Sequence, residues 1–192
     1  MNKRYITASE LLKDSFSLAM KILESDFRPS FIIGVWRGGA PIGIAVQEVL
    51  DVCGVTTEHI AIRTSSYEGI DQRSKTVKVH GLAYVIDTIK AEDNLLIVDD
   101  VHDSGLSVAE LIKQIKLRSG DSAPQSIKIA TVYFKPSQSQ VSSEPDYYLH
   151  TTNDWLVFPH ELQGLTAEEL LKNKPEVAHI IQQLQNFKSK NI

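Results

Sequence analysis

Cysteine is almost absent from this sequence, since it occurs once in 192 residues, at Cys53. A single cysteine excludes an intrachain disulfide and is typical of a reducing cytoplasm. No apolar run approaches the length of a membrane span, and the polar N-terminus lacks the apolar segment of a secretory signal. We therefore expect a cytoplasmic protein with no membrane span.

An excess of positive charge is also missing. The chain has 20 Lys and Arg residues against 24 Asp and Glu residues, which gives a formal net charge of -4. This balance excludes a general attraction to nucleic acid, so we expect no nucleic-acid partner. The six histidines show no zinc-site spacing, and no nucleophile elbow is present. The length and the 42% hydrophobic content predict one globular domain over residues 1–192.

The most informative stretch is residues 95–107, with the sequence LLIVDDVHDSGLS. Its four leading apolar residues predict a strand buried on both faces, as in a parallel sheet. Asp99 and Asp100 end this strand, and Ser107 begins an amphipathic helix. Because ligands in open α/β sheets bind outside the carboxyl ends of strands, the loop between them is a candidate site.

The loop has the chemistry of a phosphate-binding site. Gly105 can adopt backbone angles that other residues avoid, and Ser104 and Ser107 carry hydroxyl donors. The N–H groups of Gly105, Leu106 and Ser107 lie at the positive end of the helix dipole and lack helical partners. Together these groups favour a phosphate.

The carboxylates around the loop suit other ligands. Asp99 and Asp100 would repel a phosphate, but they match ribose hydroxyls or Mg²⁺. Asp103 is left beside the expected sugar and phosphate, where it is available for proton transfer.

This order of residues resembles the 5-phosphoribosyl-1-pyrophosphate (PRPP) signature of type I phosphoribosyltransferases, with serine at Ser104 and Ser107 where threonine is usual. The resemblance implies an α/β parallel-sheet fold with a small hood and a flexible loop. It places PRPP along residues 99–107, which include Val101 and His102, and Mg²⁺ at Asp100. A strand that ends in Asp-Asp also occurs in phospho-acceptor receiver domains, and we keep that alternative open.

A second anion-binding loop is expected after a short strand at residues 30–35. Trp36, Arg37, Gly38 and Gly39 form a tight turn before a helix that Ala40-Pro41 begins. The motif resembles the pyrophosphate loop of purine phosphoribosyltransferases. The resemblance implies that Trp36, Arg37 and Gly38 bind PRPP and that the peptide bond between Trp36 and Arg37 is cis. An ordinary turn is the alternative.

Residues 64–78 are polar and are predicted to form a mobile loop, with β-hairpin character at its end. The sequence Thr64-Ser65-Ser66-Tyr67 with Asp71-Gln72-Arg73 resembles the flexible loop of bacterial xanthine-guanine phosphoribosyltransferase. The resemblance implies that Arg73 contacts the pyrophosphate when the loop closes. A solvated surface loop is the alternative.

Two residues near the other end of the motif series are candidates for base recognition. Lys135 follows a strand predicted at residues 127–134, and Trp155 lies in an aromatic segment at residues 154–161. The resemblance implies that Lys135 donates to the 6-oxygen of a purine, that Trp155 stacks on the ring, and that the Leu156 backbone contacts the base edge. A surface lysine and a core tryptophan are the alternatives.

The rest of the chain predicts alternating helices and strands. Thr7 to Glu10 reads as a capping box before a helix whose apolar face includes Leu12 and Phe16, and the next helix is expected to turn Ile44 inward. Residues 82–86 are a possible strand, residues 137–145 a polar loop and residues 146–149 a short strand. Thr166 to Glu169 predicts a second capping box, at the start of a helical tail.

The motifs occur in one order, from residue 30 to residue 161, and residues 162–192 form the tail. The resemblance implies a purine-salvage enzyme that transfers phosphoribosyl from PRPP to a 6-oxopurine, with Asp103 as the catalytic residue, Mg²⁺ as the cofactor and a homodimer or homotetramer as the assembly. A PRPP-binding regulatory protein of the same fold is the second hypothesis.

Overall fold

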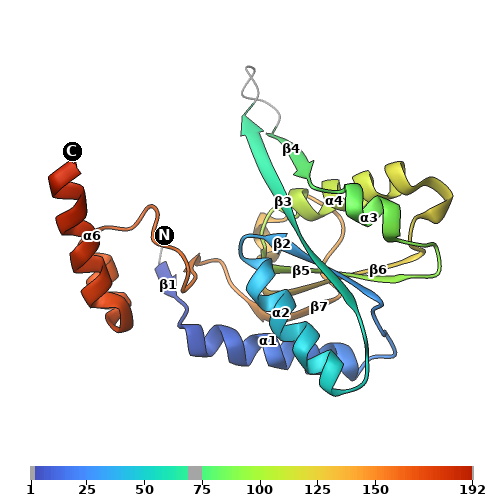
Figure 1. The fold of residues 1–192 in the computed structure, drawn as a ribbon, viewed down its shortest axis with the longest axis horizontal. Coiled ribbons are helices and arrows are strands. Elements are labelled where there is room, and N and C mark those ends of the chain that lie inside the picture. Colours follow the sequence, from blue (N-terminus) through green and yellow to red (C-terminus); the bar gives the residue numbers. More distant parts are fainter. Residues whose placement is uncertain (1–2, 69–74, 192) are drawn as a thin grey trace. The chain divides into compact units, whose positions relative to one another are not determined.

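The computed structural model describes residues 3–68 and 75–191. Figure 1 shows the elements of these ranges. The strands are β1 Lys3–Tyr5, β2 Phe31–Trp36, β3 Glu58–Glu68, β4 Lys75–His80, β5 Asn94–His102, β6 Ser126–Phe134, β7 Tyr147–Thr151 and β8 Trp155–Val157. The helices are α1 Ala8–Leu23, α2 Gly39–Val52, α3 Ala83–Thr88, α4 Leu106–Ser119, α5 Ala167–Asn173 and α6 Ala178–Asn191. Within the described ranges, no helix has both the length and the apolarity that a membrane crossing requires.

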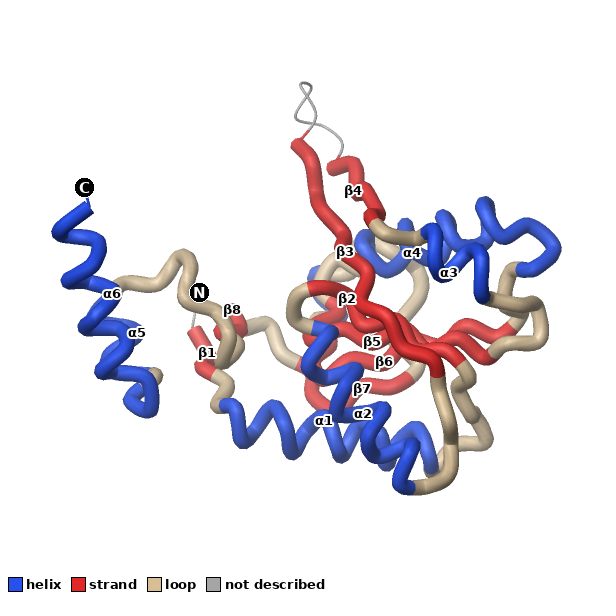
Figure 2. Tube along the Cα trace, viewed as in Figure 1, coloured by secondary structure: helices blue, strands red, loops and turns tan. Residues whose placement is uncertain are grey.

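The chain forms two compact units, which Figure 2 shows by secondary structure. The core unit is residues 12–153, and the hood unit combines residues 1–11 with residues 154–192. The single-domain organisation expected for residues 1–192 stays a prediction.

The core unit is built on a six-stranded sheet in the order β4-β3-β2-β5-β6-β7. All neighbours pair in parallel except β3 and β4, which are antiparallel. Helices α1 and α2 lie on one side of the sheet, and α3 and α4 lie on the other (Figure 1). Strand β2 is buried over residues 31–35 and β5 over residues 95–98, as their apolar runs predict. The predicted α/β fold is confirmed.

The polar segment at residues 64–78 contains the expected β-hairpin, and this hairpin is longer than predicted. Strand β3 continues to Glu68 and pairs with β4 in a hairpin, with Arg63 opposite His80 and Glu68 opposite Lys75. The β-branched residues Val77 and Val79 alternate with polar residues and favour a strand. Residues 69–74 lie outside the described residues, and the predicted PRPP contact Arg73 lies with them.

Two expectations for the helices are wrong. Residues 82–86 form the start of α3 rather than a strand, because Leu82, Val85 and Ile89 recur at helical spacing and are all buried. The apolar faces of α1 and α2 are also rotated from the predicted ones. Leu12 on α1 and Ile44 on α2 are more than half exposed.

The hood unit contains a two-stranded parallel sheet of β1 and β8, with Arg4 opposite Leu156. Strand β1 was not predicted, since three residues give too short a pattern to recognise. The tail forms α5 and α6, which pack around buried Leu170 and Ile181. The Thr166–Glu169 capping box is present, and so is the one between Thr7 and Glu10.

Candidate active site

The predicted PRPP residues of the core unit lie at one edge of its sheet. Strands β2, β5 and β6 are parallel neighbours, so their carboxyl ends point the same way. The loop after β2 carries residues 36–39, the loop after β5 carries residues 103–105, and Lys135 directly follows β6. The fold therefore brings together three segments that are far apart in the sequence.

The loops after β2 and β5 are in close contact. A side chain at Gly38 would meet the carboxylate of Asp100, because an ideal Cβ there lies 1.6 Å from Asp100 Oδ2. A side chain at Gly39 would meet the backbone oxygen of Val98 at 2.3 Å. Glycine at both positions is what allows the backbone amides of this loop to approach the two aspartates. Arg37 and Trp36 are exposed, and the peptide bond between them is cis, as the resemblance implied.

The loop after β5 encloses the predicted phosphate site. A cavity of about 90 Å³ lies there, and its lining is Asp99, Val101, His102, Asp103, Ser104, Gly105, Ser107 and Val108. Gly105 has φ +74 at the start of α4, a left-handed conformation that favours glycine. Leu106 is the first residue of the 14-residue helix α4, so the N–H groups of its first turn lack helical acceptors. This geometry fits a phosphate.

A neighbouring loop, which the sequence reading did not assign to the site, supports the phosphate loop. The Gln140 N–H donates to the Ser104 backbone oxygen at 3.0 Å. A Cβ on Gly105 would lie 2.4 Å from Val141 Cγ2, so that side chain packs directly on the glycine. Residues 137–145 were expected to form a polar loop, and no pattern in them indicated that Val141 packs on the loop after β5.

His102 is buried beneath the same loop. Neither ring nitrogen makes a hydrogen bond of ordinary geometry with another described residue, and the ring lies edge-on to Phe134 at 5.6 Å. Burial lowers the pKa of His102, although the backbone of Ser143 and the carboxylate of Asp103 oppose this in part. The ring is therefore held in its neutral form, as a packing group of the phosphate loop.

Asp99 is a partly buried carboxylate next to a second one. Burial raises the pKa of Asp99 well above its ordinary value, and the neighbouring charge of Asp100 adds to the effect. Asp99 Oδ1 accepts from the Asp100 N–H at 3.0 Å, and Asp100 Oδ1 accepts from the Val101 N–H at 2.7 Å. Ligands that donate hydrogen bonds or carry positive charge stabilise two carboxylates that lie this close together.

Asp103 and Lys135 meet in an ion pair across the loops after β5 and β6. The distance from Lys135 Nζ to Asp103 Oδ2 is 3.5 Å. The Lys135 side chain is only 9% exposed, whereas that of Asp103 is 44% exposed. The Lys135 backbone N–H donates to the His102 oxygen at 2.9 Å, which fixes where the lysine leaves the strand. Lys135 is thus not a surface lysine.

Trp155 and Leu156 belong to β8 in the hood unit. Trp155 is 56% exposed and Leu156 is buried. Its exposure shows that Trp155 is not a core tryptophan, and an exposed indole is a suitable surface for stacking on a planar base.

Two adjacent carboxylates of the core unit are the candidate ligands for the expected Mg²⁺. In the part of the chain that the structure describes, no three His, Cys, Asp or Glu side chains gather into a metal site. Asp99 and Asp100 alone would supply protein oxygens. This small set fits Mg²⁺, which usually keeps several waters and takes further ligands from substrate phosphates.

Known proteins match this fold and these segments. The profile of the phosphoribosyl transferase domain family matches residues 3–163. The chain belongs to the phosphoribosyltransferase family. A hypoxanthine-guanine phosphoribosyltransferase of Streptococcus pyogenes is 31% identical over 150 residues, which are 76% of this chain and 74% of that protein.

Two further relatives are also purine enzymes by name. A xanthine-guanine phosphoribosyltransferase of Desulfotalea psychrophila is 27% identical over 171 residues, 86% of this chain and 91% of that protein. The crystal structure of a purine phosphoribosyltransferase from Pyrococcus horikoshii has a TM-score of 0.67 and 29% identity, and the match covers 86% of this chain and 99% of that one. The relatives agree with the purine branch that the sequence motifs indicated.

Proposed function

We propose that the protein is a purine phosphoribosyltransferase of the salvage pathway, which converts PRPP and a 6-oxopurine into a nucleoside monophosphate and pyrophosphate. The observation that supports this proposal is the cavity lined by Asp99 and by residues of the loop after β5, next to Asp100, which the Gly38 backbone contacts closely. Named relatives that act on hypoxanthine, guanine and xanthine support the purine branch.

Each part of the site has a role in this reaction. The 5'-phosphate binds residues 103–107, and the two aspartates Asp99 and Asp100 hold the ribose hydroxyls. Arg37 and the Gly38 amide bind the pyrophosphate, and Trp36 and Arg73 are proposed contacts of the same group. Arginine suits pyrophosphate because its planar fork donates two parallel hydrogen bonds. Bound Mg²⁺, held at Asp100, would offset the charge of the leaving group.

In the chemical step, purine N9 forms a bond to C1' while the bond from C1' to the pyrophosphate oxygen breaks. The pyrophosphate leaves with the bonding electron pair, and the base loses one proton. Asp103 accepts that proton at N7. Since the transition state has oxocarbenium character, the protein contributes chiefly by positioning and electrostatics.

Three contacts to the base are proposed from the resemblance. Lys135 donates to the 6-oxygen, Trp155 stacks on the ring, and the Leu156 backbone contacts the base edge. The buried position of the Lys135 side chain supports this role, because a desolvated ammonium makes a strong, directional donor to a carbonyl.

The assembly and the compartment are proposed from the resemblance as well. We propose a homodimer or homotetramer that acts in the cytoplasm. Leu12, Phe16 and Met20 on α1 are all exposed and recur every four residues, so they form an apolar stripe that a second copy could cover. Light scattering coupled to gel filtration measures the mass in solution and tests this assembly.

A spectrophotometric assay tests the reaction. The protein is mixed with PRPP, Mg²⁺ and, in separate reactions, xanthine, guanine, hypoxanthine, adenine, uracil and orotate. Turnover of one or more 6-oxopurines supports the proposal and identifies the substrate. Turnover of a pyrimidine would remove the roles of Lys135 and Trp155. PRPP binding without any turnover would favour a PRPP-binding regulatory protein instead.

A further inference from the structure

The helical tail holds a buried lysine that no step of the reaction uses. Lys174 follows α5 and is only 3% exposed. Its Nζ donates to the backbone oxygens of Phe158 at 2.7 Å and Pro159 at 2.9 Å. These two residues directly follow β8, which carries Trp155 and Leu156. The tail is thus bonded to the segment proposed to contact the base.

Burying the ammonium of Lys174 costs free energy, so its position indicates a specific role. Lysine is almost never fully buried unless it is paired, because an ammonium loses its hydration. Burial lowers the pKa of Lys174, and the carboxylates of Glu161 and Glu176 oppose the shift. Both of these acceptors are backbone oxygens, which cannot swing away as a side chain can. The bonds therefore fix the position of the chain at residues 158–159.

The same turn is held from its other side. The Phe158 N–H donates to Glu161 Oε2 at 3.0 Å, and the Glu161 N–H donates to the Phe158 oxygen at 3.0 Å. The Phe158 oxygen thus accepts from both Glu161 and Lys174. Since Phe158 and Val157 are both buried, the turn has little freedom to relax around a lost bond.

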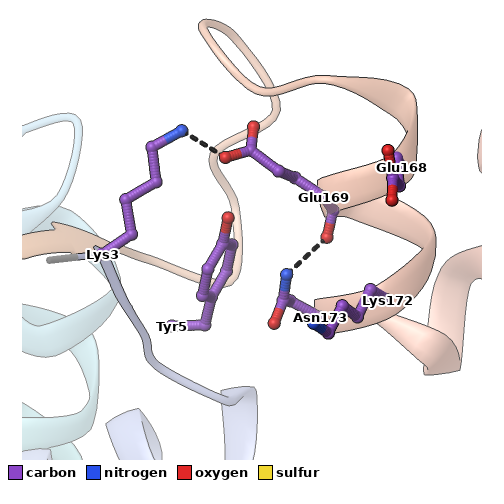
Figure 3. Close-up of a pocket in the computed structure, with 6 residues that line it drawn as sticks. All are labelled: Lys3, Tyr5, Glu168, Glu169, Lys172 and Asn173. Atoms are coloured by element: carbon purple, nitrogen blue, oxygen red, sulfur yellow. Dashed lines mark hydrogen bonds and ion pairs between the residues drawn. The ribbon is translucent and has the colours of Figure 1, made fainter.

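A second link joins α5 to the two-stranded sheet at β1. Figure 3 shows the Lys3 ammonium pointing at the Glu169 carboxylate. The two groups are 2.5 Å apart, and both residues line a cavity of about 450 Å³. Lys3 is opposite Trp155 in the register of β1 and β8. Both side chains of this pair are about one-third exposed, so the pair is a weak anchor. Lys174 is the stronger connection.

We propose that Lys174 is a positioning residue for the base-binding segment, and that the tail sets the geometry of Trp155 and Leu156 through the backbone oxygens of Phe158 and Pro159. This inference rests on the proposed function, since it assigns the tail to base recognition. The effect of the lysine is specific to the base, because the predicted PRPP residues belong to the core unit.

The variant Lys174→Met removes the ammonium and keeps the apolar stem, and Lys172→Met on the exposed side of α5 is the matched control. Kinetics at 25 °C are measured with each substrate varied in turn. Lys174→Met is expected to raise KM for the purine by roughly tenfold, because a small displacement of binding groups costs this much or more. KM for PRPP stays within about twofold, and Lys172→Met leaves both values unchanged.

Thermal unfolding separates this role from a purely structural one. A folded Lys174→Met protein with a lower melting temperature and an unchanged purine KM would overturn the inference. If Lys174→Met does not fold, Lys174→Gln keeps an N–H donor without the charge, and it must show the same selective rise in purine KM, though smaller.

Calorimetry with GMP and with PRPP alone provides a test that does not need turnover. Selective weakening of GMP in the Lys174 variant supports the inference even if the wild-type protein is not active. Equal binding of GMP by both proteins overturns it. If the wild-type protein does not turn over any purine, the proposed function is overturned, and this result is independent of the GMP measurement.

Discussion

Asp103 Oδ2 lies 3.5 Å from Lys135 Nζ, so the residue proposed to accept the base proton is paired with the residue proposed to select the base. The pair joins the loops after β5 and β6, and the Lys135 backbone N–H adds a bond to the His102 oxygen. A purine that binds with its 6-oxygen at Lys135 would therefore have its N7 directed toward Asp103. In the proposed reaction, this contact couples recognition of the base to proton transfer.

The first prediction concerns Asp103. The variant Asp103→Asn keeps the size of the side chain and removes its ability to accept a proton. Turnover is expected to fall by roughly 10²–10⁴-fold, the usual contribution of a general base, while the Kd for PRPP changes little. Steady-state kinetics and calorimetry measure the two quantities. An equal loss in turnover and in PRPP binding would remove the general-base role.

The second prediction concerns Lys135. The variant Lys135→Ala removes the donor to the 6-oxygen, and a missing hydrogen bond to a charged group typically costs about 1.5–3 kcal/mol. We expect kcat/KM to fall more for guanine or hypoxanthine than for adenine, which carries an amino group at this position. The exposed Lys113 provides the control variant Lys113→Ala. An unchanged ratio of 6-oxopurine to adenine activity would exclude Lys135 from base recognition.

The third prediction is that removing the charge of Asp99 stabilises the fold and weakens PRPP binding. Burial and the charge of Asp100 raise the pKa of Asp99 in the folded state. The contribution of Asp99 to folding stability is therefore fully present below its unfolded pKa, and it is lost as the pH rises through its folded pKa. Ionised Asp99 therefore destabilises the fold at neutral pH. Asp99→Asn is expected to increase stability by roughly 1 kcal/mol, or about 2–4 °C in Tm, and to weaken PRPP binding.

Calorimetric melting at pH 7.5 and at pH 4.5 checks the sign of this effect. The gain should be larger at the higher pH, because the raised pKa disfavours the charged carboxylate in the folded chain, whereas the unfolded chain ionises freely. The exposed Asp51 provides the control, and Asp51→Asn should leave Tm unchanged at both values. A lower Tm for Asp99→Asn at pH 7.5 would show that the Asp99 charge is already compensated in the free protein.

The fourth prediction concerns the acid side of the stability curve. Burial lowers the pKa of His102 in the folded state. The contribution of His102 to folding stability is therefore fully present above its unfolded pKa of about 6.5, and it is lost as the pH falls below that value. His59 is lowered by burial as well, and adds to the same loss. His102→Leu should reduce the slope of stability against pH below 6.5, by at most about 1.4 kcal/mol per pH unit.

Denaturant titrations between pH 7 and pH 5 measure this slope. At pH 7 the leucine variant should be as stable as the wild-type protein or more so, because it removes two buried nitrogens that lack hydrogen bonds of ordinary geometry. An unchanged slope would mean that His102 does not titrate differently in the folded and unfolded chains.

The phosphate loop could be predicted from the sequence because all of its parts are contiguous. A buried strand, two aspartates and a Ser-Gly turn occupy 13 residues at positions 95–107, and each part has a local chemical meaning. The same holds for the Gly38 loop and the capping boxes. By contrast, Val141 packs on Gly105 through a contact between loops that share no pattern, so only the structure reveals it.

The missed elements have equally physical causes. Strand β1 pairs with residues more than 150 positions away, and its three residues carry no periodic signal. The β3–β4 hairpin was expected only at the end of its segment, because β4 is an edge strand, where burial does not enforce an apolar pattern. The sequence did not identify Lys174 as a buried residue, because no local rule predicts a lysine buried against backbone oxygens.

Product analysis with a single base tests the central claim most directly. The wild-type protein is incubated with PRPP, Mg²⁺ and guanine, and the nucleotide and pyrophosphate are quantified by chromatography, with hypoxanthine and xanthine assayed in parallel. The account predicts equimolar nucleoside monophosphate and pyrophosphate from at least one of these bases, and little of either from Asp103→Asn. PRPP that stays bound and intact with all three bases would contradict the account.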